Sequence, residues 1–491
     1  MLLHNGPIYT MDPRLPRVAA LAVADEKIAG GVDVREGEVD TVGHERVDLD
    51  GRCVLPGFTD SHIHFLMWAL GRAQLDLHGC ASRGEALRRV GEHLGDGWLL
   101  GFGWLDAEWA DGPPTVASLD EVTGDRPAAL WAHDHHTLWV NSAALAAAGA
   151  PSREGPLQEW EAFRFPLPEP SGAERTKAVR EAMAEANGRG VVSVHDFQAT
   201  GGREVWQRLD ADRRLNLRVR ASFPLSLLDA ALELELRTGF GSDLLRVGPA
   251  KAFMDGTLGS RTAWMLDGSG DQLLSEDELA EAVERAARGG LGVAVHAIGD
   301  GANRAALNAF ARTRHVWEDA LVRPRIEHAQ CVAPADVARF AELGVIASMQ
   351  PTMLHSDRDV ADERWPAITS QVYRWRDLLD AGAHVIFGSD APIEEVAPLR
   401  SIEAAVHRTL DDRPAWHGDQ ALSVADAVLG HTAAAAYACG DERWRGCLLP
   451  GYAADLVVLD TDIVEHPDRI GSTSVVATML AGRWVYGRPP W

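Results

Sequence analysis

Short apolar runs alternate with amphipathic stretches through the middle of this chain. Runs rich in Val, Ile and Ala occur at 188–197, 216–225, 244–256, 291–300, 322–330, 344–351 and 383–392. The segment 275–290 begins with a Ser-x-x-Glu capping box and ends on glycine, which predicts a helix. Repeated β-then-α units indicate an α/β fold with a parallel sheet covered by helices, and the usual long form is a (β/α)8 TIM barrel.

The spacing of the polar residues that end these runs favours the barrel. Lys251 and His296 are 45 residues apart, His296 and His328 are 32 apart, and His328 and Asp390 are 62 apart. A barrel uses roughly 30 residues for each βα unit, so the intervals fit one, one and two units. These residues are therefore predicted to end strands 4, 5, 6 and 8.

The start of the barrel is placed by the stretch LPGFTDSHIH at 55–64. Its two histidines, His62 and His64, would end strand 1, but 187 residues then separate His64 from Lys251, where three units need roughly 90. We therefore expect an insertion after strand 1, at about 70–180. The two ends of the chain, 1–53 and 441–491, are short β-runs broken by Gly, Pro and Asp. They predict a small composite β-sandwich domain and leave 54–440 for the barrel.

Side chains at the carboxyl ends of barrel strands converge on one mouth, where barrel enzymes keep their active sites. Four imidazoles and one carboxylate there offer ligands for zinc or a similar divalent ion. One such histidine alone is more often a hydrogen-bonded core or surface residue, but the full set predicts a metal centre of one or two ions. The residues collected at this mouth are His62, His64, Lys251, His296, His328 and Asp390.

Composition narrows the class of protein. The 491 residues are 46% hydrophobic and 24% charged, and the net charge of −25 argues against nucleic acid or an anionic membrane as a partner. We see no run of about 18 apolar residues, no basic segment at the start and no CxxC pair, so we expect no membrane helix, signal peptide or thiolate zinc site. These features favour a cytoplasmic enzyme with a small-molecule substrate. Barrels of this kind often pair, so a homo-oligomer is compatible with the sequence.

Several segments also resemble a known family. LPGFTDSHIH, HAIGDGANR, RIEHAQ and FGSDAP, in this order and with these gaps, are similar to the amidohydrolase superfamily. KAFMDGTLGSRTA, HHTLWVNSAAL and SMQPT resemble its YtcJ-like branch, which includes N-substituted formamide deformylases. The resemblance covers nearly the whole chain and is specific for the superfamily, but it says little about the substrate.

The resemblance implies a role for each residue at the mouth. His62 and His64 would bind the more buried metal, while His296 and His328 would hold a second. Asp390 would touch the first metal and act as a general base, accepting a proton from water and passing it to the leaving amine.

Lys251 needs a separate explanation, because an ammonium group has no lone pair with which to bind a cation. Burial beside a metal favours the neutral amine, which can take up carbon dioxide and become a carbamate, N6-carboxylysine. The resemblance favours this anionic form, which could bridge two ions. The alternative is an unmodified lysine that pairs with Asp255 beside a single metal.

Three residues of the insertion are candidates for binding substrate. His136 stands before the WVN of the resembling segment, although His133 and His135 are equally available. Trp104 and Trp139 could line an apolar pocket, although tryptophan is more often a core residue. An insertion with many tryptophans and few lysines favours an aromatic or alkyl amide as substrate.

Three functions fit this set of residues. The first is a metal-dependent hydrolase that cleaves a C–N amide-type bond of an N-acyl or N-formyl amine. The second is a non-hydrolytic enzyme with the same metals, such as an isomerase, lyase or decarboxylase. The third, a non-catalytic protein with a degenerate site, is disfavoured because the ligand set is complete.

Overall fold

The computed structural model describes residues 1–30, 45–93, 95–106, 109–133, 136–320 and 322–491. The chain forms two compact units, one of Met1–Phe65 with Arg180–Trp491 and one of Leu66–Val179. The second unit overlaps the insertion expected at 70–180, and the domain boundaries drawn from the sequence stay predictions. Across the described ranges, no helix combines the length and the apolar character that crossing a membrane requires.

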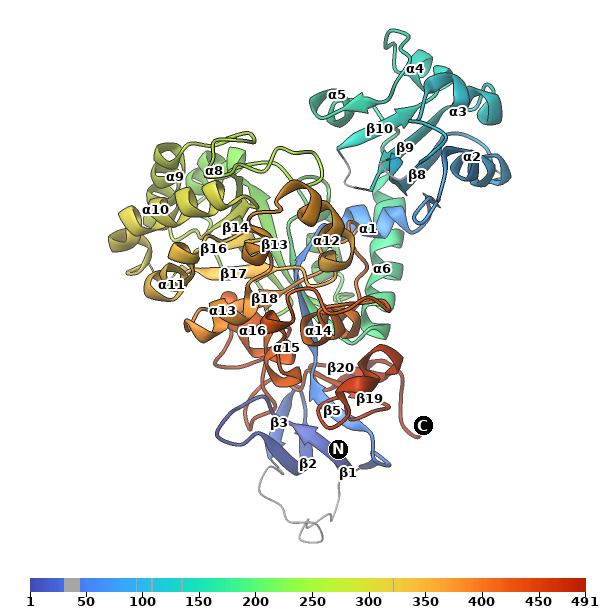
Figure 1. Cartoon of the computed structure of the whole chain (residues 1–491). Coiled ribbons are helices and arrows are strands. Elements are labelled where there is room, and N and C mark those ends of the chain that lie inside the picture. The colour runs from blue at the N-terminus through green and yellow to red at the C-terminus, as the bar shows by residue number, and fades with distance from the viewer. Residues whose placement is uncertain (31–44, 94, 107–108, 134–135, 321) are drawn as a thin grey trace. The chain divides into compact units, whose positions relative to one another are not determined.

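Eight parallel strands of the first unit form a nearly closed barrel, in the spatial order β6-β12-β13-β14-β15-β16-β17-β18. Figure 1 labels β13, β14, β16, β17 and β18 of this barrel. A parallel bridge between Ile63 and Ala391 joins the two ends of this order. The predicted (β/α)8 barrel is confirmed. Its strands are β6 (Phe58–Ile63), β12 (Val191–Asp196), β13 (Arg218–Pro224), β14 (Leu245–Phe253), β15 (Val293–Ala297), β16 (Arg325–His328), β17 (Ile346–Met349) and β18 (Val385–Phe387).

Helices between these strands cover the barrel, as parallel sheets require. Helix α9 begins as its sequence predicts, since the Ser275 side chain accepts from the Glu278 amide and Glu278 reaches back to the Ser275 amide. The helices of this part of the chain are α6 (Gly172–Gly188), α7 (Gly202–Ala211), α8 (Leu228–Glu233), α9 (Glu276–Arg288), α10 (Asp300–Trp317), α11 (Pro334–Leu343), α12 (Met353–Arg364), α13 (Trp375–Asp380), α14 (Pro398–His407), α15 (Val424–Gly430) and α16 (Ala433–Ala438).

Strands from both termini build one mixed sheet, in the order β21-β20-β19-β5-β1-β2-β3, with β4 beside β1. Alternate residues of its central strands serve two cores: Val54 and Val458 pack within the sheet's own core, while Leu55 and Val457 pack against the barrel. The strands are β1 (Leu2–Tyr9), β2 (Arg17–Ala24), β3 (Lys27–Gly30), β4 (Arg46–Asp48), β5 (Cys53–Pro56), β19 (Leu456–Leu459), β20 (Val475–Leu480) and β21 (Arg483–Tyr486).

The second unit has its own five-stranded sheet, in the order β11-β10-β9-β8-β7, and its own apolar core. Asn141 caps α4 by accepting from the Ala144 amide. Its elements are α1 (Phe65–Gly71), β7 (Leu75–Asp76), α2 (Arg83–Glu92), β8 (Leu99–Trp104), α3 (Val116–Thr123), β9 (Ala128–Ala132), β10 (Thr137–Val140), α4 (Ser142–Ala147), β11 (Leu157–Gln158) and α5 (Trp160–Phe163).

Candidate metal centre

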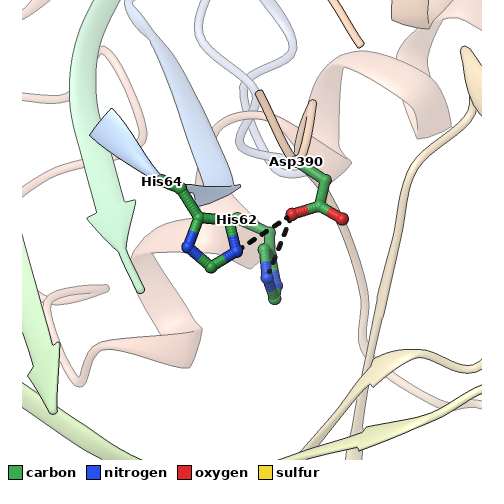
Figure 2. Close-up of side chains that lie close together, drawn as sticks. All are labelled: His62, His64 and Asp390. Atoms are coloured by element: carbon green, nitrogen blue, oxygen red, sulfur yellow. Dashed lines mark ion pairs between the residues drawn. The ribbon is translucent and has the colours of Figure 1, made fainter. Parts of the chain in front are cut away.

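Three of the predicted ligands meet at the mouth of the barrel. One ligand atom from each of His62, His64 and Asp390 lies within 4.8 Å of the other two. The Nε2 atoms of both histidines are 3.4 Å from Oδ1 of Asp390 (Figure 2). His62 is fully buried, whereas the side chain of His64 is 25% exposed. The cluster therefore has one inner ligand and one that faces the opening.

The backbone around strand 1 places Asp390 against the two histidines. The Asp390 amide donates to the His62 carbonyl at 2.7 Å, and the buried Asp60 carboxylate accepts from the amides of His62 and Ser389. Gly388 allows this close approach, because a Cβ there would lie 2.4 Å from the His62 nitrogen. Asp390 itself has a φ of 58°, a strained conformation that is typical of functional sites.

The orientation of His62 is fixed by the buried carboxylate of Glu327, which is itself paired with Arg325. Nδ1 of His62 is 2.6 Å from Oε2 of Glu327, and Arg325 donates to the same carboxylate oxygen at 2.9 Å. Burial opposes ionisation of Glu327, but Arg325 and Lys251 hold the pKa of this carboxyl below its usual range. A carboxylate at Nδ1 assigns the proton to that nitrogen, so the lone pair of Nε2 points toward Asp390.

His296 and His328 come from the neighbouring strands 5 and 6. Their ring centroids are 4.5 Å apart, and the His328 ring lies 5.0 Å from that of His62. Burial, followed by the two neighbouring histidines, holds the pKa of His328 well below its usual range, so its imidazole is neutral and able to bind a metal. Nε2 of His296 lies 3.0 Å from the Gly256 carbonyl. His328 adopts a φ of 73°, a second strained backbone position at this mouth.

Lys251 reaches the same place from strand 4. Its Nζ lies 3.4 Å from Nε2 of His62, and the residue is only 5% exposed. Burial lowers the pKa of the amine to about 8, against the attraction of Glu327 and Asp390. No ion pair joins Lys251 to Asp255 in the structure as described. The Asp255 carboxylate instead accepts from backbone amides such as those of Ile298 and Gly299.

The residues fit a bound cation. Oδ1 of Asp390 is buried and has no hydrogen-bond partner within the described part of the chain. The lone pair of His62 Nε2 faces this oxygen at 3.4 Å and has Nζ of Lys251 as a long contact at 3.4 Å, so two electron-rich atoms converge without a hydrogen bond between them. A divalent ion with nitrogen and oxygen ligands satisfies both atoms, and His64 supplies a third donor.

Two residues at this mouth escaped the sequence analysis. Oε1 of Gln350 lies 2.9 Å from Nδ1 of His328, and Phe197 stacks on His62 with ring centroids 4.3 Å apart. The sequence contained a signal for both residues, because each directly follows a predicted barrel strand and should therefore lie at the mouth. Gln350 follows strand 7, and Phe197 follows strand 2. Their side chains position the histidines from two further strands of the barrel.

The three substrate candidates lie in the second unit. Trp104 and Trp139 are 2% and 0% exposed, belong to the core of that unit, and donate their indole N–H groups to the carbonyls of Leu130 and Thr115. Both tryptophans therefore pack in the core of this unit, and their predicted contact with substrate stays a prediction. Nδ1 of His136 lies 2.9 Å from Glu159, and its predicted role stays a prediction. His135, one alternative to it, lies outside the described residues.

Comparison with known proteins decides the family. The model of the amidohydrolase family Amidohydro_3 matches residues 45–486, which includes every residue of the candidate centre. The chain belongs to this family. The resemblance seen in the sequence is thereby confirmed, together with its YtcJ-like branch.

Individual relatives extend over nearly the full length. Protein LONG AFTER FAR-RED 3 of Arabidopsis thaliana is 31% identical, covering 99% of this chain and 91% of that protein. YtcJ of Bacillus subtilis (strain 168) is 28% identical over 98% of both. N-substituted formamide deformylase of Arthrobacter pascens is 24% identical, covering 95% and 94%. A crystal structure described as an uncharacterized metal-dependent hydrolase from Pyrococcus horikoshii OT3 is 29% identical with a TM-score of 0.81, covering 94% and 98%.

Proposed function

We propose that this amidohydrolase family member is a metal-dependent hydrolase that cleaves the C–N amide-type bond of an N-acyl or N-formyl amine. The observation that carries the proposal is the cluster of His62, His64 and Asp390, with an unpartnered carboxylate oxygen facing a neutral imidazole. Similarity to a formamide deformylase and to a structure called a metal-dependent hydrolase supports this reaction class.

The chain offers ligands for one or two ions, with zinc as the expected metal. His62 and His64 would hold the first, His296 and His328 the second, and Asp390 would touch the first. A divalent ion in such a site supplies Lewis-acid polarisation and lowers the pKa of water from 15.7 to about 7.

Each side chain then has a task in amide hydrolysis. Asp390 accepts a proton from the attacking water and delivers it to the leaving amine nitrogen, as a general base that becomes an acid. Glu327 keeps His62 in the tautomer with a free Nε2, and Arg325 holds Glu327 in place. Phe253, 46% exposed with its ring 5.2 Å from that of His296, offers an aromatic surface for an apolar substituent. We therefore infer an aromatic or alkyl amide rather than a highly charged substrate.

A panel of N-formyl and N-acyl amines with aliphatic and aromatic substituents tests the reaction. We expect the zinc-loaded protein to release free amine from at least one class, with aromatic and alkyl members preferred over multiply anionic ones. Chelation should lower the rate by roughly 10³-fold, since metal activation contributes several kcal/mol, and added zinc should restore it. If fully loaded protein releases no amine from the whole panel, the proposal fails and a non-hydrolytic metal enzyme takes its place.

We also propose that Lys251 carries a carbamate when metal is bound. The neutral amine attacks the carbon of carbon dioxide, so that a C–N bond forms, one C=O π bond opens to give the carboxylate, and the nitrogen releases one proton to solvent. Burial lowers the pKa of this amine to about 8, which favours the neutral form that the step requires. The anionic product would be stabilised by a cation held beside it.

Protein loaded with zinc in ¹³C-bicarbonate is therefore expected to show one carbamate carbon signal by ¹³C NMR, absent from Lys251→Ala. Lys177→Ala, a change of a lysine in α6, is the matched control and should keep the signal. A spectrum of active, zinc-loaded protein without this signal would leave Lys251 as a plain amine.

A further inference from the structure

A cavity lies near the amino ends of strands 4 to 6. Its volume is about 240 Å³, and its wall includes Gly248 of β14, Gly292 just before β15, and Cys439. Four arginines line it, and no Asp or Glu of the described ranges does so. These arginines are Arg220, Arg237, Arg323 and Arg325.

Positive charge exceeds negative charge beside this cavity. The fully buried carboxylate of Asp441 is shared by Arg220, Arg445 and Arg246, with the latter two at 2.8 Å and 3.1 Å. Among the described residues, Arg246 alone of these three arginines has a further carboxylate partner, Asp243 on the surface. A buried guanidinium stays protonated, and a charge held in the interior without full compensation is costly. The single carboxylate of Asp441 therefore does not neutralise the three guanidinium groups around it.

Two of the four arginines that line the cavity lack partners for part or all of their guanidinium groups among the described residues. Nε and Nη1 of Arg220 are buried and have no hydrogen-bond partner within the described residues, although the residue is only 3% exposed. Arg237 is exposed, lies against Gly290 and forms no ion pair with any described residue. Arg323 is already bound to Glu442, and Arg325 to Glu327 and His195.

We propose that this cavity binds a small oxyanion, namely the phosphate or carboxylate group of a metabolite, through Arg220 and Arg237. The planar fork of a guanidinium matches two oxygens of such a group, and charge-assisted hydrogen bonds are among the strongest in proteins. The anion balances the charge that Asp441 alone leaves uncompensated, and it satisfies the two unpartnered donors of Arg220. This site is separate from the metal ligands, so it stands or falls independently of the proposed hydrolase activity.

Equilibrium dialysis with labelled inorganic phosphate, at constant ionic strength set with chloride, tests the site on the full-length protein. We expect one saturable site per chain. Arg237→Gln should weaken binding roughly tenfold or more, because it removes a charge-assisted pair. Arg220→Gln should abolish binding in protein that keeps a cooperative melt. Arg214→Gln, an exposed arginine outside the cavity, should bind as the unchanged protein does.

A parallel series with labelled succinate distinguishes a phosphate site from a carboxylate site, because the anion that binds with the lower Kd shows which of the two groups the cavity prefers. His62→Ala should retain binding, which excludes anion held at the metal centre. The proposal is overturned if neither anion binds saturably. It is also overturned if Arg237→Gln binds the anion as tightly as Arg214→Gln does. The Arg237→Gln variant should fold, because the Arg237 side chain is exposed.

Discussion

Replacing Asp390 by asparagine is expected to lower kcat/KM by about 10²–10⁴-fold while the metal content stays close to that of the unchanged protein. Asparagine keeps the size of the side chain and one oxygen near Nε2 of His62 and His64, but it cannot take up a proton. The loss should therefore fall on turnover more than on metal binding. Steady-state kinetics on the best amide of the panel, together with elemental analysis, measure both quantities.

Asp412→Asn is the matched control for this change. Asp412 is exposed and is not one of the three clustered ligands, so its amide variant should have normal activity. Normal turnover of metal-loaded Asp390→Asn would remove Asp390 from its role as general base.

Replacing His62 by alanine is expected to remove at least one metal ion and to lower activity by roughly 10³-fold, which corresponds to several kcal/mol of lost metal activation. This histidine is fully buried and is the ligand that Glu327 and Phe197 hold in one orientation. Its loss takes away the Nε2 lone pair that faces Asp390, and it removes one of the groups that hold Oε2 of Glu327, while Arg325 keeps its contact with this oxygen. Elemental analysis after dialysis against trace zinc gives the stoichiometry.

His431→Asn separates loss of a ligand from loss of a buried histidine. His431 is 2% exposed and hydrogen-bonds the Thr59 carbonyl and Ser401, away from the cluster. This variant should be less stable, with a lower Tm, yet keep its full metal content. Equal metal content in His62→Ala and the unchanged protein would contradict the assignment of His62 as a ligand.

The residues that end the barrel strands could be predicted because two simple rules act together. A parallel strand buried on both faces reads as an apolar run, and a barrel repeats such runs at a nearly constant interval. His296 and His328 followed directly from that interval, as did the strand number of Lys251. The insertion was visible as one interval that was far too long.

The partners of several side chains could not be predicted, because they depend on tertiary contacts and not on the spacing of the strands along the sequence. Glu327 contacts both Nδ1 of His62, which lies 265 residues away in the chain, and Arg325, and the spacing of the strands does not reveal the first of these contacts. Trp104 and Trp139 had the composition of a pocket lining, but each indole N–H finds a carbonyl inside the second unit. The role of Asp255 also had to come from the fold, because its carboxylate accepts from the backbone amides of Trp264, Ile298 and Gly299, two of which are about forty residues away.

The most direct test is anomalous diffraction from crystals of the zinc-loaded protein, measured on both sides of the zinc absorption edge. We expect a peak at bonding distance, about 2.0–2.2 Å, from Nε2 of His62, Nε2 of His64 and a carboxylate oxygen of Asp390. A second peak beside His296 and His328 would establish the two-ion form. The account is contradicted if active protein shows zinc density elsewhere and none between these three side chains.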